Sequence, residues 1–361
     1  MRLSLKPVEH FVRRRLLRSG RRQFTGAMAT GAEDLLRLPA APAILLMRQE
    51  RIGDVLVGIP VLRALRQRYP AGRIHLLVSR NNYAARDAVA PFVDRVWRYD
   101  KTLPSALALL RALRRERYDV VVDLVDNPSA ISRVVIGWCG ARLAVGLAHA
   151  DAGYYSHAAP LLDRATVHPV ERLAQLLLPF GIDPATVPLD LEYRLSEADQ
   201  RRARELLGPR SRPLRLGVNI SGRGPERYWG RDNFVALIRH LAATDERFEV
   251  SVCGAPRDAE EVAAVAAATG LEPVPPLTSL HEFAAVIHEF DLVLTPDTAV
   301  VHLAAAWKIP TVGLYHGQPG IMPWLPYRSP HRSVIDDRGI GWIPLDEVTA
   351  ALDQLKSEKF G

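Results

Sequence analysis

Short apolar runs alternate with longer amphipathic stretches along the first half of the chain. The apolar runs, rich in Val, Leu and Ile, predict strands at 43–47, 74–79, 95–99, 119–125 and 143–147. Stretches with helical spacing lie near 54–68, 82–90, 103–117, 129–140 and 167–180. This repeated strand–helix order predicts a parallel sheet that is covered by helices on both faces.

The pattern is interrupted at 181–200, where Pro, Gly and polar residues predict a linker. A second alternating block follows, with strands predicted at 214–220, 248–254, 291–295 and 310–316. Its helices are predicted near 231–244, 257–269, 280–290, 298–307 and 345–358. Two doubly wound halves are therefore expected, and in such folds ligands bind at the carboxyl ends of the strands.

Composition agrees with an ordinary globular protein of about two domains, since 48% of the 361 residues are hydrophobic and 24% are charged. The expected division is a basic extension at 1–40, an N-terminal Rossmann-like domain at 41–190, a C-terminal Rossmann-like domain at 210–345 and a terminal helix at 346–361. Cys139 and Cys253 each lie in an apolar stretch, which is typical of buried, reduced cysteines and gives no disulfide framework or zinc spacing.

Positive charge is concentrated at the N-terminus. Residues 1–22 hold eight Lys or Arg against Glu9, so they account for the whole formal net charge of +7. The remaining chain is nearly neutral, and no nucleic-acid groove is expected. Apolar residues between the charges fit a helix that lies on an anionic membrane surface, and a solvated arginine tail fits equally well. Neither a signal peptide nor a spanning helix is expected.

Two positions at strand ends are candidates for chemistry. Asp54 lies at the turn from a strand to a helix, where it is either a helix cap or a reactive carboxylate. Asp297 and Thr298 open another helix, where free N–H groups suit a phosphate and capping is the alternative. His302 lies one helical turn beyond Thr298, and a buried core histidine is the alternative there.

The loop NISGRGPERYWGR (219–231) follows the first strand of the second half. It carries Arg223, Arg227 and Arg231 beside small residues, which favours a diphosphate over a merely solvated loop. No dinucleotide fingerprint, P-loop, G-x-S-x-G or H-E-x-x-H motif occurs.

Together these stretches resemble glycosyltransferase family 9, the bacterial lipopolysaccharide heptosyltransferases. RIGDVLVGIPVLRALRQRYP is similar to the opening motif of that family, and DLVLTPDTAVVHLAAAWKIPTVGLY to its donor motif. The resemblance extends over about residues 43–345 and includes RYWG, GAPRDAEE, LTSLHEFAAVI and HPVERLAQLLLPFGI. The order and separation of the two main motifs make it specific.

The resemblance implies a GT-B fold, with two Rossmann-like doubly wound domains facing a central cleft. It implies inverting transfer of a sugar, expected to be heptose from ADP-heptose, to lipopolysaccharide core or a related glycan. Asp54 matches the catalytic base, and Arg48 and Arg51 flank the acceptor side. The implied donor-binding residues are Ser221, Gly222, Arg223, Arg227, Asp258, Thr278, Asp297, Thr298, Ala299 and His302. No D-x-D motif stands at a strand end, and neither a metal nor another cofactor is expected.

Some positions depart from the family pattern. Ala299 replaces a Gly, Gly230 replaces a Pro, and Gly222 and Arg223 replace hydroxyl residues. Two alternatives remain open: a nucleotide-sugar epimerase of the same fold, and an inactive nucleotide-sugar-binding protein, for which Ala299 is the only support. The expected location is the cytoplasm, on the inner face of the inner membrane if residues 1–22 form a surface helix. Donor sugar, acceptor and oligomeric state are not fixed by the sequence.

Overall fold

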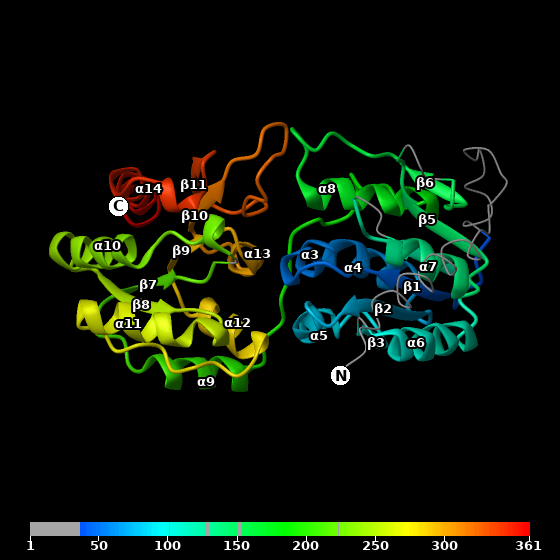
Figure 1. Ribbon diagram of the computed structural model, residues 1–361, viewed down its shortest axis with the longest axis horizontal. Helices are drawn as coiled ribbons and strands as arrows, with labels where there is room; N and C mark the ends of the chain where they lie inside the picture. Colours follow the sequence, from blue (N-terminus) through cyan, green and yellow to red (C-terminus); the bar gives the residue numbers. More distant parts are fainter. Residues whose placement is uncertain (1–36, 101, 127–129, 150–152, 223) are drawn as a thin grey trace, which may run out of the picture. The chain divides into compact units, whose positions relative to one another are not determined.

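The computed structural model describes residues 37–100, 102–126, 130–149, 153–222 and 224–361 (Figure 1). The basic tract 1–22 lies outside the described residues. Two compact units are present. The first runs to Asp163 and includes Pro169–Leu189, and the second contains Arg164–His168 and Asp190–Gly361. The short segment 164–168 therefore packs with the second unit, although it interrupts the first in sequence.

The first unit is built on a sheet of six parallel strands. They are β1 (Ala43–Met47), β2 (Arg73–Ser79), β3 (Arg95–Tyr99), β4 (Val120–Asp123), β5 (Leu143–Leu147) and β6 (His157–Ala159). Their order in the sheet is β3-β2-β1-β4-β5-β6, so the winding reverses between β1 and β4, where Met47 is the register partner of Asp123. Loops beyond the carboxyl ends of these two strands form the usual ligand position of such a sheet.

Helices α6 (Leu103–Arg115) and α7 (Ala130–Trp138) cover one face of this sheet and share a core with β1. Helices α3, α4, α5 and α8 span Ile52–Val57, Ile59–Arg68, Arg86–Val89 and Pro169–Ala174. The single helix predicted near 54–68 is thus divided at Gly58, because Pro60 in the first turn of α4 has no N–H to continue the ladder of α3.

Two other predicted helices of the first unit are shorter than expected. The stretch 82–90 forms a 3₁₀ turn, Tyr83–Ala85, before α5. The stretch 167–180 ends as a 3₁₀ segment, Gln175–Phe180, which contains Pro179. Apolar periodicity correctly predicted helical segments that pack on the core. It does not distinguish an α-helix from a 3₁₀ helix, so the 3₁₀ turns were not predicted.

The second unit has five parallel strands. They are β7 (Leu214–Asn219), β8 (Phe248–Cys253), β9 (Leu292–Pro296), β10 (Thr311–His316) and β11 (His331–Asp336). Their order is β11-β10-β9-β7-β8, and the winding reverses between β7 and β9. The edge strand β11 is half-buried and lacks the continuous apolar run by which sequence analysis recognises buried strands.

Six helices of the second unit are α9 (Glu197–Leu207), α10 (Arg231–Thr244), α11 (Ala259–Thr269), α12 (Leu280–His288), α13 (Ala299–Ala306) and α14 (Leu345–Phe360). Apolar side chains of α10, α11 and α14 form one core with the sheet. Helix α9 begins inside the stretch predicted as a linker. Ser196 caps it, and its one fully buried residue, Ala203, gives it little apolar periodicity.

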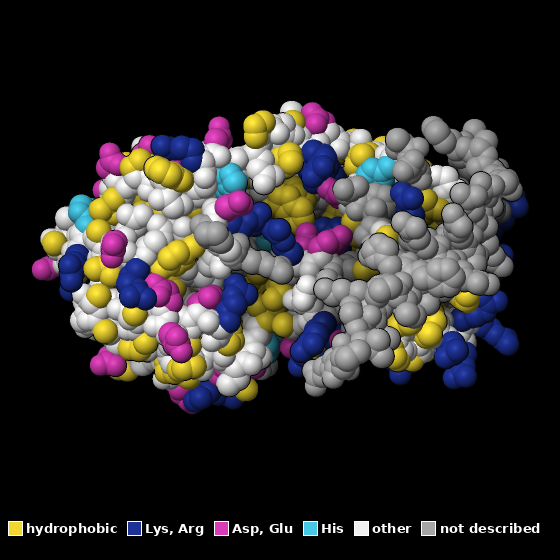
Figure 2. Space-filling view, in the orientation of Figure 1, with side chains coloured by type: hydrophobic (Ala, Val, Ile, Leu, Met, Phe, Trp, Pro, Cys, Tyr) yellow, Lys and Arg dark blue, Asp and Glu magenta, His cyan; other side chains and the backbone are white. Residues whose placement is uncertain are grey.

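Both units are therefore doubly wound parallel sheets, which confirms the predicted α/β fold class. Basic and acidic side chains are interspersed over the visible face of the second unit (Figure 2). This mixed surface fits the nearly neutral body that the charge distribution predicts.

Candidate functional site

Asp54 lies at the switch point of the first sheet, in the first turn of α3. Its Oδ2 accepts a hydrogen bond of 2.6 Å from the backbone N–H of Arg51, so the carboxylate caps the helix. Its Oδ1 lies 3.2 Å from Nη2 of Arg48. The residue is 8% exposed. Asp54 is therefore both a cap and a nearly buried carboxylate held in a fixed orientation by an ion pair.

Arg48 has a different place from the one expected for an acceptor contact. It is 3% exposed, its Nε donates to the Asp54 carbonyl at 3.1 Å, and its Nη1 donates to the Leu124 carbonyl. The guanidinium thus joins β1, α3 and the segment after β4. In this structure Arg48 is a buried partner of Asp54 and not a surface arginine, whereas Arg51 is exposed, as an acceptor contact requires.

Three further carboxyl groups lie near Asp54, and sequence analysis did not select them. Glu50 follows β1, and Asp123 and Asp126 lie at and just beyond the end of β4. Burial raises the pKa of Glu50, and it raises the pKa of Asp123 to about 7. Acidic residues at the end of, or just after, the apolar runs 43–47 and 119–125 are the signal that could have indicated them.

At the switch point of the second sheet, hydroxyl groups gather around Asn219. Its Nδ2 donates to Oγ1 of Thr295 at 2.8 Å and to Oγ1 of Thr298 at 3.2 Å. The Thr298 hydroxyl also accepts from the N–H of Val300 and caps α13. Asn219 and Thr295 were not selected from the sequence, although a polar residue at the end of an apolar strand is the signal for both. The network fixes the hydroxyl predicted to contact a phosphate.

Arg227 and Asp297, both predicted donor residues, form an ion pair of 2.7 Å. Arg227 ends a 3₁₀ turn, Pro225–Arg227, and each side chain of the pair is about one quarter exposed. A guanidinium that remains accessible beside a helix N-terminus is well suited to a diphosphate, which would compete with Asp297 for it.

The loop after β7 is shaped by close backbone contacts. A Cβ atom at Gly222 would lie 2.1 Å from the Arg227 carbonyl oxygen, so a larger residue there would displace the turn that carries Arg227. Ser221 is buried, and its Oγ accepts from the N–H of Ala255 at 2.6 Å, which ties this loop to the one after β8. Arg223 lies outside the described residues.

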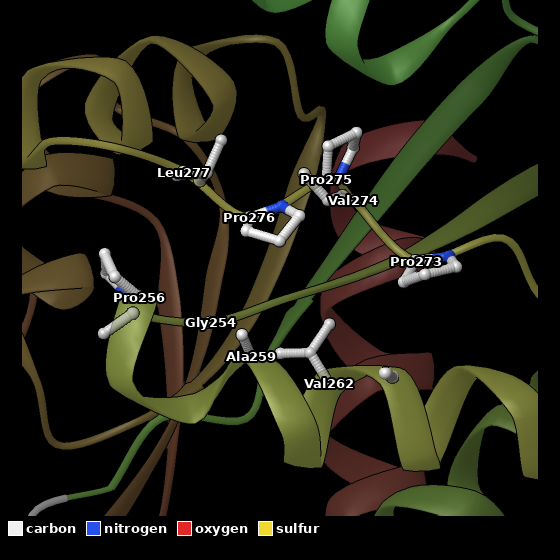
Figure 3. Close-up of a pocket in the computed structure, with 11 residues that line it drawn as sticks. Gly254, Pro256, Ala259, Val262, Pro273, Val274, Pro275, Pro276 and Leu277 are labelled. Carbon is white, nitrogen blue, oxygen red and sulfur yellow. The ribbon is translucent and has the colours of Figure 1, made fainter.

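A small apolar hollow of about 60 Å³ lies beyond the end of β8 (Figure 3). Its walls are Gly254, Ala255 and Pro256, three residues of α11, and the segment Pro273–Leu277. Thr278, predicted for a base pocket, is not in this wall. It is exposed and donates to Glu282 through both its hydroxyl and its backbone N–H. The adjoining Leu277 reaches the hollow instead.

A second, more open hollow of about 330 Å³ is lined in part by Gly222, Tyr228, Asp258 and Glu261. Asp258, predicted for ribose hydroxyls, therefore lies beside the loop that carries Arg227. Its Oδ2 is buried and has no hydrogen-bond partner among the described residues. An unpaired carboxylate oxygen in a hollow is a ready acceptor for a hydroxyl group.

His302 is 3% exposed, and its Nδ1 has no hydrogen-bond partner in the described chain. Burial, together with the smaller effect of the nearby His168, lowers the pKa of His302 to about 3, so the ring is neutral near pH 7. Its centroid lies 6.0 Å from that of Trp324. Ala299, also predicted for the donor side, is the first residue of α13.

Among the described residues, no group of three or more His, Cys, Asp or Glu side chains is arranged to hold a metal ion. Within the same part of the chain, no helix combines the length and apolar character needed to span a membrane.

Comparison with known proteins shows the family. The family model described as glycosyltransferase family 9 (heptosyltransferase) matches residues 106–332. Lipopolysaccharide heptosyltransferase 3 of Escherichia coli K12 is 24% identical over 85% of this chain and 96% of its own length.

Solved structures show the same fold. A glycosyl transferase of family 9 from Veillonella parvula superposes with a TM-score of 0.73 at 19% identity, covering 88% of this chain and 97% of its own. The ADP-heptose lipopolysaccharide heptosyltransferase II of E. coli superposes with a TM-score of 0.69 at 21% identity, covering 88% and 100%. The GT-B-like architecture expected from the sequence is thereby confirmed.

Proposed function

The chain belongs to glycosyltransferase family 9, and from this premise we propose that it transfers heptose from ADP-heptose to a sugar hydroxyl of lipopolysaccharide core or a related glycan. The observation that carries the proposal is the position of Asp54 and Arg227 at the switch points of the two sheets. One switch point offers a carboxylate, and the other offers a guanidinium beside a helix N-terminus. These are the groups that a base and a diphosphate site require.

Asp54 is proposed as the general base. Its carboxylate accepts the proton of the acceptor hydroxyl while the hydroxyl oxygen forms a bond to the anomeric carbon. The bond between that carbon and the diphosphate oxygen breaks with its electron pair, and ADP leaves. Because attack comes from the face opposite the leaving group, the anomeric configuration inverts. The ion pair with Arg48 supports this role by keeping Asp54 in one orientation.

We propose that Arg227, the Thr298 hydroxyl and the first N–H groups of α13 stabilise the negative charge that develops on the departing diphosphate. The hydrogen bond from Asn219 keeps the Thr298 hydroxyl in place before the reaction, so little reorganisation is needed. The neutral ring of His302, in the same helix, adds a polar group without a competing positive charge.

We propose that the second unit also holds the remaining parts of ADP. Asp258 and its hollow suit ribose hydroxyls, and the apolar wall of Figure 3 suits the face of a purine. On the first unit, Arg51 is proposed to contact a phosphate or acidic sugar of the acceptor. The basic tract 1–22 is proposed to hold the enzyme on the anionic cytoplasmic membrane surface.

A thermal-shift screen of nucleotides and nucleotide sugars tests the donor assignment. A ligand at a concentration of 100 Kd should stabilise the fold by ~2.7 kcal/mol. ADP and ADP-heptose should raise Tm, while UDP- and GDP-sugars should have smaller effects. Equal shifts for all nucleotides, or none for ADP, would contradict the assignment.

A further inference from the structure

Polar atoms that are buried without a hydrogen-bond partner gather at the switch point of the first unit. Within the described residues they are both amide atoms of Gln49, Oε2 of Glu50, Oδ1 of Asp123 and Oδ1 of Asp126. Native proteins pair the great majority of such atoms, because an unpaired buried group destabilises the fold. That five such atoms lie in the two segments that end β1 and β4 points to an external partner.

These atoms belong to one neighbourhood. Gln49 and Glu50 follow β1, whose last residue, Met47, is the register partner of Asp123. Glu50 is close enough to interact electrostatically with both Asp54 and Asp126, and Asp123 interacts in turn with Glu50. The proposed base therefore borders the cluster.

The protein satisfies Asp123 and Asp126 in part. Asp123 is 0% exposed, and its carboxyl group accepts hydrogen bonds from the Tyr155 hydroxyl, at 2.9 Å from Oδ2, and from Ser132, while Oδ1 remains unpaired. Arg172 donates through Nε to Oδ2 of Asp126 at 3.0 Å and leaves the other oxygen unpaired. Arg48 approaches Glu50 Oε2 only to 3.8 Å, beyond hydrogen-bond distance.

The chemistry of the cluster selects its ligand. Carboxylate oxygens accept hydrogen bonds, and the Gln49 amide can both donate and accept. An anionic group would be repelled by the acids. Metal ions are disfavoured, because the described residues include no set of acids and histidines arranged to ligate one. A neutral molecule with several hydroxyl groups supplies what these atoms lack.

We propose that Gln49, Glu50 and Asp126 form a subsite for the hydroxyl groups of the acceptor sugar ring that reacts at Asp54, with Asp123 as its buried floor. This subsite rests on the proposed function and specifies the acceptor: the reacting ring is an uncharged polyol. Any phosphate or carboxylate of the acceptor is kept away from the acids and reaches the exposed side chain of Arg51.

The sharpest test is Gln49→Leu, which replaces the amide with a slightly shorter apolar side chain. At saturating ADP-heptose, KM for a lipid-free core oligosaccharide should rise roughly tenfold, since buried sugar hydroxyls lose their partner. Tm should stay unchanged or rise, because an unpaired amide has been removed. A lower Tm with unchanged KM would show that the amide has a structural role and would overturn the subsite.

Glu50→Gln is the second variant, because it keeps the shape but weakens hydrogen-bond acceptance. It should raise the acceptor KM for both the native and the dephosphorylated oligosaccharide, while Kd for ADP stays within twofold of wild type. Asp87→Asn, which removes a partly exposed carboxylate of the same unit that pairs with Arg86, is the matched control and should change neither constant. An acceptor KM unaffected by both Gln49→Leu and Glu50→Gln would overturn the inference.

Direct binding of the oligosaccharide by saturation-transfer NMR separates this inference from the proposed reaction. If no heptose is transferred but binding is present and is lost in Gln49→Leu, the subsite holds and the proposed reaction fails. If transfer occurs and binding is identical in wild type and Gln49→Leu, the reaction holds and the subsite fails.

Discussion

The switch points of the two sheets have the same topological position but opposite chemistry. In the first unit, the segments after β1 and β4 bring together four carboxyl groups and leave several of their oxygens unpaired; the buried Arg48 pairs with Asp54, and the buried Arg172 pairs with Asp126. In the second unit, the segments after β7 and β9 bring together hydroxyls, an amide and Arg227, and they pair most of these groups with one another.

This difference shows how one fold type can serve two roles. Parallel strands place loops and helix N-termini at one edge, whatever the sequence. The residues at strand ends then decide whether that edge accepts protons and hydroxyl groups or neutralises a diphosphate. Substitutions at the two edges should affect different steps, and the largest loss of activity is expected at the acidic edge.

Asp54→Asn should reduce kcat roughly 10²–10⁴-fold, because the amide cannot accept the proton of the attacking hydroxyl. The amide oxygen can still accept from the Arg51 N–H, so the start of α3 should persist. Single-turnover transfer measures the loss of rate. Calorimetric titration with ADP shows whether the variant still folds and binds the nucleotide. Near-wild-type turnover would reduce Asp54 to a helix cap.

Arg227→Ala should act at the other edge. Kd for ADP should rise roughly tenfold to hundredfold, because a charged hydrogen-bond partner of the diphosphate is lost, while adenosine should bind about as before. Arg210→Ala is the matched control, since Arg210 pairs with Asp291 at 2.6 Å on the exposed surface. Equal losses for ADP and adenosine would show that Arg227 does not contact the phosphates.

Asp123→Asn should change the pH dependence of stability. The pKa of Asp123 is about 7 in the folded chain against an ordinary value of 3.8, so between these pH values the folded chain holds a proton that the unfolded chain has released. Stability contributed by this group therefore falls as pH rises from about 4 to about 7, and it is constant above that range.

An asparagine at 123 has no proton to lose in this range. Urea unfolding at about pH 5 and pH 8 should give a smaller difference for Asp123→Asn than for wild type, with the variant gaining relative stability at the higher pH. Asp87→Asn should keep the wild-type difference. The same pH difference in wild type and Asp123→Asn would contradict a protonated buried carboxyl at this edge.

Deletion of residues 1–38 should have the smallest effect on chemistry, because it ends before β1 and removes none of the residues assigned to either edge. Transfer to a lipid-free acceptor should continue at nearly the full rate. Binding to anionic vesicles should fall sharply, and binding of the intact chain should weaken with salt, since each basic residue near the surface contributes about 1 kcal/mol. Vesicle binding that is independent of the tract or of salt would exclude the membrane-surface helix.

The sequence predicted the fold class and most strands because apolar periodicity and turn residues are local signals. It also selected Asp54, Arg227 and Thr298, which lie in recognisable positions between a strand and a helix. Burial of Arg48 could not be predicted, because it depends on the folded chain bringing the carbonyl groups of Asp54 and Leu124, which are distant in sequence, to the same guanidinium. The same holds for Asn219, whose role depends on pairing between β7 and β9.

Inverting heptose transfer is tested most directly by the reaction itself. ADP-heptose and a lipid-free lipopolysaccharide core oligosaccharide are incubated with the enzyme, and the products are followed by mass spectrometry and by NMR of the anomeric proton. The expected products are free ADP and an acceptor that carries one added heptose, with an anomeric configuration opposite to that of the donor. Retained configuration, an altered sugar without any acceptor product, or ADP release with the acceptor unchanged would contradict inverting heptose transfer.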